Sequence, residues 1–146
     1  MKIECPEFQN ETAMPSKFTC DGEDVAPPIK ITGVPKDAKT LALIVDDPDA
    51  VSGTWVHWTV WNIPAEASVM LEGGLPGSIA QGVTSSGNIG YAGPCPPSGT
   101  HRYFFRAYAL DSELDLSPET MADALMQAME GHVLDKAQLI GLYERL

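Results

Sequence analysis

A short apolar run at residues 41–45, Leu-Ala-Leu-Ile-Val, most constrains how this chain can fold. The run is too short for a helix and lies between turn-forming residues, so it predicts a strand buried on both faces. It ends in the acidic segment Asp-Asp-Pro-Asp at residues 46–49. The proline, serine and glycine of this region predict a turn or loop that continues as far as Trp55.

A second strand is predicted over residues 56–63, where aromatic and β-branched residues are frequent. The two-residue period of a strand places alternate side chains on opposite faces. One face would carry His57, Thr59 and Trp61, and the other Val56, Trp58 and Val60. Because consecutive strands usually lie side by side, His57 should lie close to the carboxylates that end the first strand.

Residues 90–111 repeat this arrangement of a loop that leads into a strand beginning with a histidine. The segment 93–99, Gly-Pro-Cys-Pro-Pro-Ser-Gly, predicts a rigid irregular loop. The following strand would place His101, Tyr103 and Phe105 on one face and Arg102, Phe104 and Arg106 on the other. Two such loops, each next to a histidine, predict one shared pocket.

Several motifs of unusual composition give the chain a specific resemblance. They are DPDA at 47–50, WVHW at 55–58, GPCPPSGTHRY at 93–103, KFTCDGEDVAPPIKI at 17–31 and GHVLDKAQLIGLYER at 131–145. Together they closely resemble the phosphatidylethanolamine-binding protein family, in particular its short bacterial and archaeal members, often called Raf kinase inhibitor-like proteins. The resemblance covers nearly the whole chain. One departure is Val51, which stands where the family usually continues DPDA with a proline.

The resemblance implies a small cavity that holds a phosphate or a carboxylate. The family's pocket positions fall on Asp47, His57, Cys95, His101 and Tyr103. It also implies an alternative function, inhibition of a kinase or a serine protease through exposed loops. The short members lack the C-terminal helix of larger relatives, so the surface left uncovered is expected to support a homodimer.

The residue types themselves suit an anion. Asp47 is expected to accept a hydrogen bond from His57, orienting the ring and favouring its cation, so that the other nitrogen donates to the ligand. Gly93 would let the loop approach closely, and Cys95 would supply a backbone N–H that its proline neighbours lack.

The remaining groups of the pocket would fit the rest of a ligand. The hydroxyl of Tyr103 would be a further donor, and Asp49 could meet an ammonium group. Trp55, Trp58 and the prolines suit an organic remainder. The sequence therefore predicts a non-catalytic binding protein for phosphate or phospholipid head-group ligands, with Asp47, Asp49, His57, Gly93, Cys95, His101 and Tyr103 as its site.

The 146-residue length fits one domain, residues 1–146, and the content of 13 Gly and 12 Pro favours a turn-rich, mainly β protein. We predict an antiparallel β-sandwich with one or two short helices. The one convincing helix would begin at Ser117, carry an apolar stripe at residues 121, 125 and 129, and end at Gly131.

Other elements have weaker patterns. Short strands are predicted at residues 2–5, 17–20 and 29–32. Residues 65–92 have little periodicity and many small residues, so they are expected to form a long loop that is either functional or a plain connector. Residues 137–143 fit a strand or a helix by pattern, and the family resemblance favours a strand.

The net charge of −11 makes nucleic acids and anionic lipid surfaces unfavourable partners. No Lys/Arg cluster offsets it, so a bound anion must lie in a small recessed site. No apolar run approaches 18 residues, and the N-terminal sequence lacks the features of a signal peptide. We therefore expect a cytoplasmic protein with no integral membrane segment.

Cys5, Cys20 and Cys95 are expected to be reduced thiols, with a bridge between Cys20 and Cys95 as the alternative. A free Cys95 on the pocket rim would be the most reactive thiol.

Asp47 and Asp49 match the start of a calcium loop, but Val51 stands at a ligand position and Trp58 stands where the closing Glu would be. No nucleophile or nucleotide motif is present. We expect no metal, no cofactor and no enzyme activity, and a hydrolase is the third alternative after the binding protein and the inhibitor.

Overall fold

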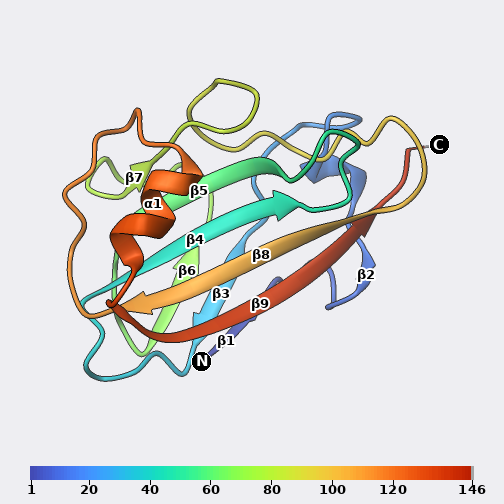
Figure 1. Cartoon of the computed structure of the whole chain (residues 1–146). Coiled ribbons are helices and arrows are strands. Elements are labelled where there is room, and N and C mark those ends of the chain that lie inside the picture. The colour runs from blue at the N-terminus through green and yellow to red at the C-terminus, as the bar shows by residue number, and fades with distance from the viewer. Residues whose placement is uncertain (146) are drawn as a thin grey trace.

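The computed structural model describes residues 1–145 and has two β-sheets packed face to face (Figure 1). Within these residues the larger sheet has the order β2 (Thr12–Ala13), β9 (Val133–Tyr143), β8 (His101–Leu110), β4 (Thr40–Asp47), β5 (Trp55–Pro64) and β7 (Ala80–Gln81). The smaller has the order β1 (Lys2–Glu4), β3 (Ile29–Thr32) and β6 (Ser68–Leu71). All pairings are antiparallel except β2 with β9. The predicted β-sandwich is confirmed.

Strand β4 lies at the centre of the larger sheet, and all eight of its residues are buried. Leu41 and Leu43 face the smaller sheet and join its core, which includes Ile29 and Ile31. Ile44 faces the other way, toward helix α1 (Ala122–Met129). Figure 1 shows this helix over one end of the larger sheet's outer face. Burial on both faces explains why the strand is apolar without alternation.

Helix α1 begins later than the sequence predicts. Ser117 starts a turn and accepts a hydrogen bond from the N–H of Thr120, and Met121 then forms a β-bridge with Val83. This bridge keeps Met121 extended, so the predicted start at Ser117 is wrong. The core positions of the stripe at Leu125 and Met129 are confirmed, whereas Met121 is exposed.

Two weaker predictions are also wrong. Residues 17–20 do not form a strand, because Ser16–Phe18 is a short 3-10 helix (η1) in which Thr19 N–H donates to the carbonyl of Ser16. Residues 65–92 are not a continuous loop, because β6 and β7 extend the two sheets. The strand predicted at residues 137–143 is confirmed as part of β9.

No helix of residues 1–145 is long and apolar enough to cross a membrane.

A β-bulge changes the direction of His57. Val45 lies opposite Trp58 and Asp46 lies opposite Val56, so His57 has no partner on β4. Such an extra residue breaks the alternation of side chains along a strand. The ring of His57 contacts Tyr103 with centroids 5.2 Å apart, whereas Trp61 packs in the apolar cluster beneath α1. The prediction that His57 shares a face with Thr59 and Trp61 is therefore wrong.

Candidate functional site

A cavity of about 450 Å³ lies where β4 ends and where β5 and β8 begin. Its lining includes six of the seven predicted site residues, namely Asp47, His57, Gly93, Cys95, His101 and Tyr103. Asp49 is the exception. The two histidine-bearing loops therefore do form one pocket, because β5 and β8 are the two neighbours of β4.

Asp47 and His101 form the central polar pair of this cavity. Nδ1 of His101 lies 2.6 Å from Oδ2 of Asp47, and both residues are buried. The other carboxylate oxygen of Asp47 accepts the backbone N–H of Asp49 at 2.8 Å. Because the carboxylate accepts at Nδ1, Nε2 of His101 is the nitrogen left for a ligand. The prediction that Asp47 orients His57 is wrong, since its imidazole partner is His101.

His57 is held by the backbone instead. Its Nδ1 lies 2.6 Å from the carbonyl oxygen of Ala92, which can only accept, so Nδ1 carries the hydrogen. Burial is the largest influence on the pKa of His57 and lowers it. The expectation that a carboxylate makes His57 cationic is therefore wrong. A neutral His57 leaves Nε2 as a hydrogen-bond acceptor.

Tyr103 connects the two histidines. Its ring contacts that of His57 edge to face at 5.2 Å and lies nearly parallel to that of His101 at 6.4 Å. Burial, followed by the charge of Asp47, raises the pKa of Tyr103. The phenol therefore keeps its O–H at neutral pH and stays a potential hydrogen-bond donor at the cavity.

The carboxylate of Asp49 forms an ion pair with Arg102. Its carboxylate accepts hydrogen bonds from Nε and Nη2 of Arg102 at 2.9 and 2.8 Å, and from the backbone N–H of Arg102. These bonds to Arg102 lower the pKa of Asp49 to about 2. The structure does not bring Asp49 to the cavity, so the ammonium contact predicted for it has no geometric support.

Asp24, which the sequence analysis did not select, lies in the cavity wall and fastens the 93–99 loop. Its Oδ1 accepts the N–H of Gly93 at 2.7 Å, so that N–H is not free for an anion. A Cβ on Gly93 would lie 2.3 Å from this oxygen and 2.5 Å from the carbonyl oxygen of Phe18. Glycine is thus required for the close approach to Asp24 and Phe18, and the close approach to a ligand expected for Gly93 stays a prediction. Asp24 belongs to the family motif at residues 17–31, which could have pointed to it. Its contact with Gly93 depends on the folded chain and could not be predicted from the sequence.

A disulfide ties the same two segments together. Cys20 and Cys95 are bonded, with Cα atoms 5.5 Å apart, and the N–H of Cys20 donates to the carbonyl of Pro94 at 3.1 Å. The expectation of a free, reactive Cys95 is wrong, and the alternative bridge is present. Within residues 1–145 the backbone N–H of Cys95 has no hydrogen-bond partner, so it is available as a donor.

The arrangement separates donors from acceptors. The Tyr103 hydroxyl and the Cys95 N–H can donate to an anion, and Nε2 of His101 can do so when both ring nitrogens carry hydrogen. The carboxylate of Asp24 and Nε2 of a neutral His57 can accept from another part of a ligand. Among residues 1–145, no group of three His, Cys, Asp or Glu side chains is placed to hold a metal ion.

Sequence and structure comparisons agree on the relatives of this chain. The sequence profile named "Phosphatidylethanolamine-binding protein" matches residues 4–144. A UPF0098 protein of Methanothermobacter thermautotrophicus is 51% identical, with 99% of each chain covered. A UPF0098 protein of Pyrococcus horikoshii is 47% identical over 94% of this chain and 74% of the relative.

Two crystal structures have the same fold. A phosphatidylethanolamine-binding protein homologue from Chlamydia trachomatis superposes with a TM-score of 0.92 at 37% identity, covering 99% of this chain and 97% of the other. Escherichia coli YbcL, described as a new member of the mammalian family, gives a TM-score of 0.90 at 27% identity, covering 99% and 98%. The chain belongs to the phosphatidylethanolamine-binding protein family.

Proposed function

We propose that this protein binds small molecules that carry a phosphate or a carboxylate in the cavity between its two histidine loops, without transforming them. The observation that carries this proposal is the buried Asp47–His101 pair, whose Nδ1 to Oδ2 distance is 2.6 Å. It orients an imidazole at the cavity beside the Tyr103 hydroxyl and the Cys95 backbone N–H. Such donors suit the oxygens of an anion.

The cavity has room for more than an anion. At about 450 Å³ it is within the usual range of small-molecule sites. Trp55 and Pro97 in its lining are apolar and suit an organic substituent. A phosphate monoester or diester, with a small organic group, therefore fits the chemistry of the walls.

The contacts of the reactive side chains favour binding over catalysis. Nδ1 of each pocket histidine is already bonded, to Asp47 or to the Ala92 carbonyl, and the sulfur of Cys95 is in a disulfide. An activated nucleophile needs a neighbouring base within hydrogen-bond reach. Among residues 1–145, no serine or cysteine side chain makes such a bond to His57 or His101.

Three expectations from the sequence stay predictions. They are a cytoplasmic location, a homodimer, and inhibition of a kinase or serine protease as the alternative function. The Cys20–Cys95 disulfide bears on the first, because disulfides persist mainly in oxidising compartments. Inhibition through exposed loops should survive loss of the pocket histidines, whereas ligand binding should not.

The binding proposal is tested by titrating the protein with inorganic phosphate and with dimethyl phosphate, followed by NMR shifts of backbone amides. His101→Ala should weaken binding roughly ten- to a hundredfold, because a charge-assisted hydrogen bond contributes about 1.5–3 kcal/mol. His132→Ala is a matched control, since His132 also bonds an aspartate, Asp111, at 2.7 Å but lies outside the cavity. Equal affinity in wild type and His101→Ala would contradict the proposal.

A further inference from the structure

A second cavity lies on the outer face of the larger sheet, the face turned away from the smaller sheet. It has a volume of about 430 Å³ and is formed by β8 and β9. Its lining includes Arg106, Tyr108, Lys136 and Gln138, none of which borders the cavity with the two histidines. We call it the β8–β9 cavity. Helix α1 covers only one end of this face (Figure 1), and Tyr108 lies at the border of the apolar cluster beneath the helix.

The register of the two strands places these four polar side chains together. Arg106 lies opposite Gln138, and Tyr108 lies opposite Lys136. Residues two apart on a strand share a face, and the intervening Ala107 packs in the core between the sheets. All four side chains therefore project from the outer face. Directly opposite and diagonal neighbours on such a face are close enough for long side chains to meet one ligand.

Arg106 is held in place and still has free donors. Its Nη1 donates to Oδ2 of Asp46 at 2.6 Å, and its Cζ lies 4.6 Å from the centroid of the Phe104 ring. Within residues 1–145, Nε and Nη2 make no hydrogen bond. The side chain is 31% exposed and lines the cavity, so the guanidinium is accessible to a ligand. Its two parallel N–H groups match the two oxygens of a carboxylate.

Lys136 adds a second positive charge to the cavity. In the part of the chain that the structure describes, its ammonium group takes part in no ion pair. The neighbouring Asp135 lies on the other face of β9 and pairs with the N-terminal amine at 3.1 Å. The Tyr108 hydroxyl and the Gln138 amide likewise make no hydrogen bond within residues 1–145. In a protein of net charge −11, such a group of donors without internal partners indicates a site for an anion.

The position of the two cations indicates the kind of anion. Arg106 and Lys136 are diagonal neighbours, so one acid group can meet the guanidinium while a second meets the ammonium. A dicarboxylate carries its two charges on separate groups, as this arrangement requires, whereas a phosphate monoester carries both on one phosphate.

The size and surroundings of the cavity favour a small ligand. Its volume is within the usual range of small-molecule sites. A nucleic acid or an acidic protein would also meet the field of the chain's 20 acidic residues and would be repelled. A small anion needs only the local positive charge.

We propose that the β8–β9 cavity is a second binding site, which takes small dicarboxylates through Arg106 and Lys136. The site is independent of the proposed function, because the two cavities share no lining residue.

Titration of the whole protein with succinate, followed by NMR shifts of backbone amides, tests this proposal. The amides of residues 106–108 and 136–138 should shift and saturate. Lys136→Gln should weaken succinate binding at these amides about fivefold, the upper range for an exposed ion pair, and acetate should bind there about fivefold more weakly than succinate. His101→Ala should leave these shifts unchanged, since His101 lies in the other cavity.

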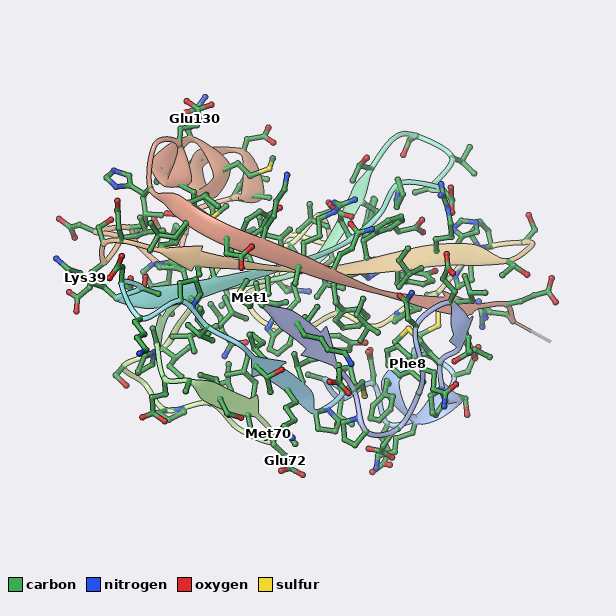
Figure 2. The ribbon with its side chains drawn as sticks, turned by 90° about the horizontal axis from the view of Figure 1, so that it is seen from below. Met1, Phe8, Lys39, Met70, Glu72 and Glu130 are labelled. Atoms are coloured by element: carbon green, nitrogen blue, oxygen red, sulfur yellow. A yellow bond between two sulfur atoms is a disulfide. The ribbon has the colours of Figure 1, made fainter. Side chains whose placement is uncertain are left out.

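Two further variants separate a specific site from a general effect of charge. Lys30→Gln is the matched control, because Lys30 is also exposed and without an ion pair in the described chain, but lies opposite Met70 in the smaller sheet (Figure 2). It should leave succinate affinity within about twofold of wild type. Arg106→Lys keeps the positive charge beside Asp46 but loses the parallel N–H pair, so it should weaken binding.

Several results would overturn the proposal. They are the absence of saturable shifts at residues 106–108 and 136–138 at millimolar succinate, equal affinities of Lys136→Gln and Lys30→Gln, and loss of these shifts in His101→Ala. Succinate shifts confined to Cys95 and His101 would support the proposed function and overturn the second site. Tighter binding of methyl phosphate than of succinate at the β8–β9 amides would overturn the preference for dicarboxylates.

Discussion

Oδ2 of Asp47 lies 2.6 Å from Nδ1 of His101, 54 residues further along the chain. Strands β4 and β8 are antiparallel neighbours, so the end of β4 and the beginning of β8 meet at the same edge of the sheet. Both side chains are buried there. A buried carboxylate that accepts from one imidazole nitrogen fixes the ring, so Asp47 is expected to act on a ligand through His101.

Asp47→Asn should weaken the binding of dimethyl phosphate by about tenfold. Both oxygens of Asp47 accept hydrogen bonds, from His101 and from the Asp49 N–H, so the amide of asparagine must leave one of them unmade. A purely electrostatic effect would have the opposite sign, because the variant is less negative. NMR titration at constant pH would measure the affinity.

Asp46→Asn is the control for this charge change. Asp46 is the preceding residue, but it pairs with Arg106 at 2.6 Å and does not line the cavity. Its replacement should leave the affinity for dimethyl phosphate within about twofold of wild type. Equal or tighter binding by Asp47→Asn would show that Asp47 does not hold His101 for the ligand.

Gly93→Ala should destabilise the protein and distort the pocket. The added Cβ would meet Oδ1 of Asp24 at 2.3 Å and the Phe18 carbonyl oxygen at 2.5 Å. Overpacking of this kind typically costs about 1–3 kcal/mol, and backbone atoms cannot swing away as a flexible side chain can. The free energy of unfolding in urea would give the cost.

Gly74→Ala is a suitable reference for Gly93→Ala. No atom lies within 4 Å of a Cβ placed on Gly74. Its free energy of unfolding should therefore stay within about 0.5 kcal/mol of wild type. Similar stabilities of the two variants would mean that the 93–99 loop does not pack against residues 18–24 as described.

The sequence allowed the position of the pocket to be predicted because its signals are local. The run at residues 41–45 is buried on both faces, and the loops before His57 and His101 begin the strands on either side of it. Consecutive strands usually pair, which places the loop before His57 beside the end of the buried strand. The loop before His101 lies at the same edge because β8 is the other neighbour of β4. Six of the seven predicted residues line one cavity for this reason.

The contacts within the pocket could not be predicted because they depend on register. One extra residue at the bulge turns His57 toward Tyr103, and no two-residue period contains that information. Once His57 is turned, the nearest acceptor for Nδ1 is the Ala92 carbonyl rather than Asp47. The pairing of Asp24 with Gly93 joins segments 69 residues apart, which only the folded chain brings together.

The thiols should react in an order set by the disulfide. In the oxidised protein Cys20 and Cys95 have no free thiol, and Cys5 is buried, which raises the pKa of its thiol. Iodoacetamide should therefore label the native protein slowly and only at Cys5. Peptide mass mapping would identify the site, and labelling of Cys95 without a reductant would contradict the bridge.

Replacing both Cys20 and Cys95 by serine should lower the free energy of unfolding by about 2–4 kcal/mol. The bridge joins residues 75 apart, so it closes a long loop in the unfolded chain. Three hydrogen bonds also join residues 18–24 to residues 91–94 and should remain. One of them is the 2.7 Å bond from the Tyr91 hydroxyl to the Phe18 carbonyl. Binding of dimethyl phosphate by the folded serine variant should therefore persist.

The burial of His57 should make stability depend on pH. Burial lowers its pKa in the folded protein below the value of 6.5 for an unperturbed histidine. Below pH 6.5 the unfolded chain therefore binds more protons at this residue than the folded protein does. The contribution of neutral His57 to the free energy of unfolding is complete above pH 6.5. It is lost as the pH falls toward the lower pKa that His57 has in the folded protein.

His57→Asn isolates this effect, because asparagine can still donate to the Ala92 carbonyl but does not titrate. Urea unfolding of both proteins at pH 7.5, 6.0 and 5.0 should show the wild type losing stability relative to the variant on acidification. The slope for one histidine is at most about 1.4 kcal/mol per pH unit. Titrating groups that do not contact His57 are common to both proteins and cancel in the difference. A difference that does not change between pH 7.5 and 5.0 would mean that His57 keeps its ordinary pKa in the folded protein.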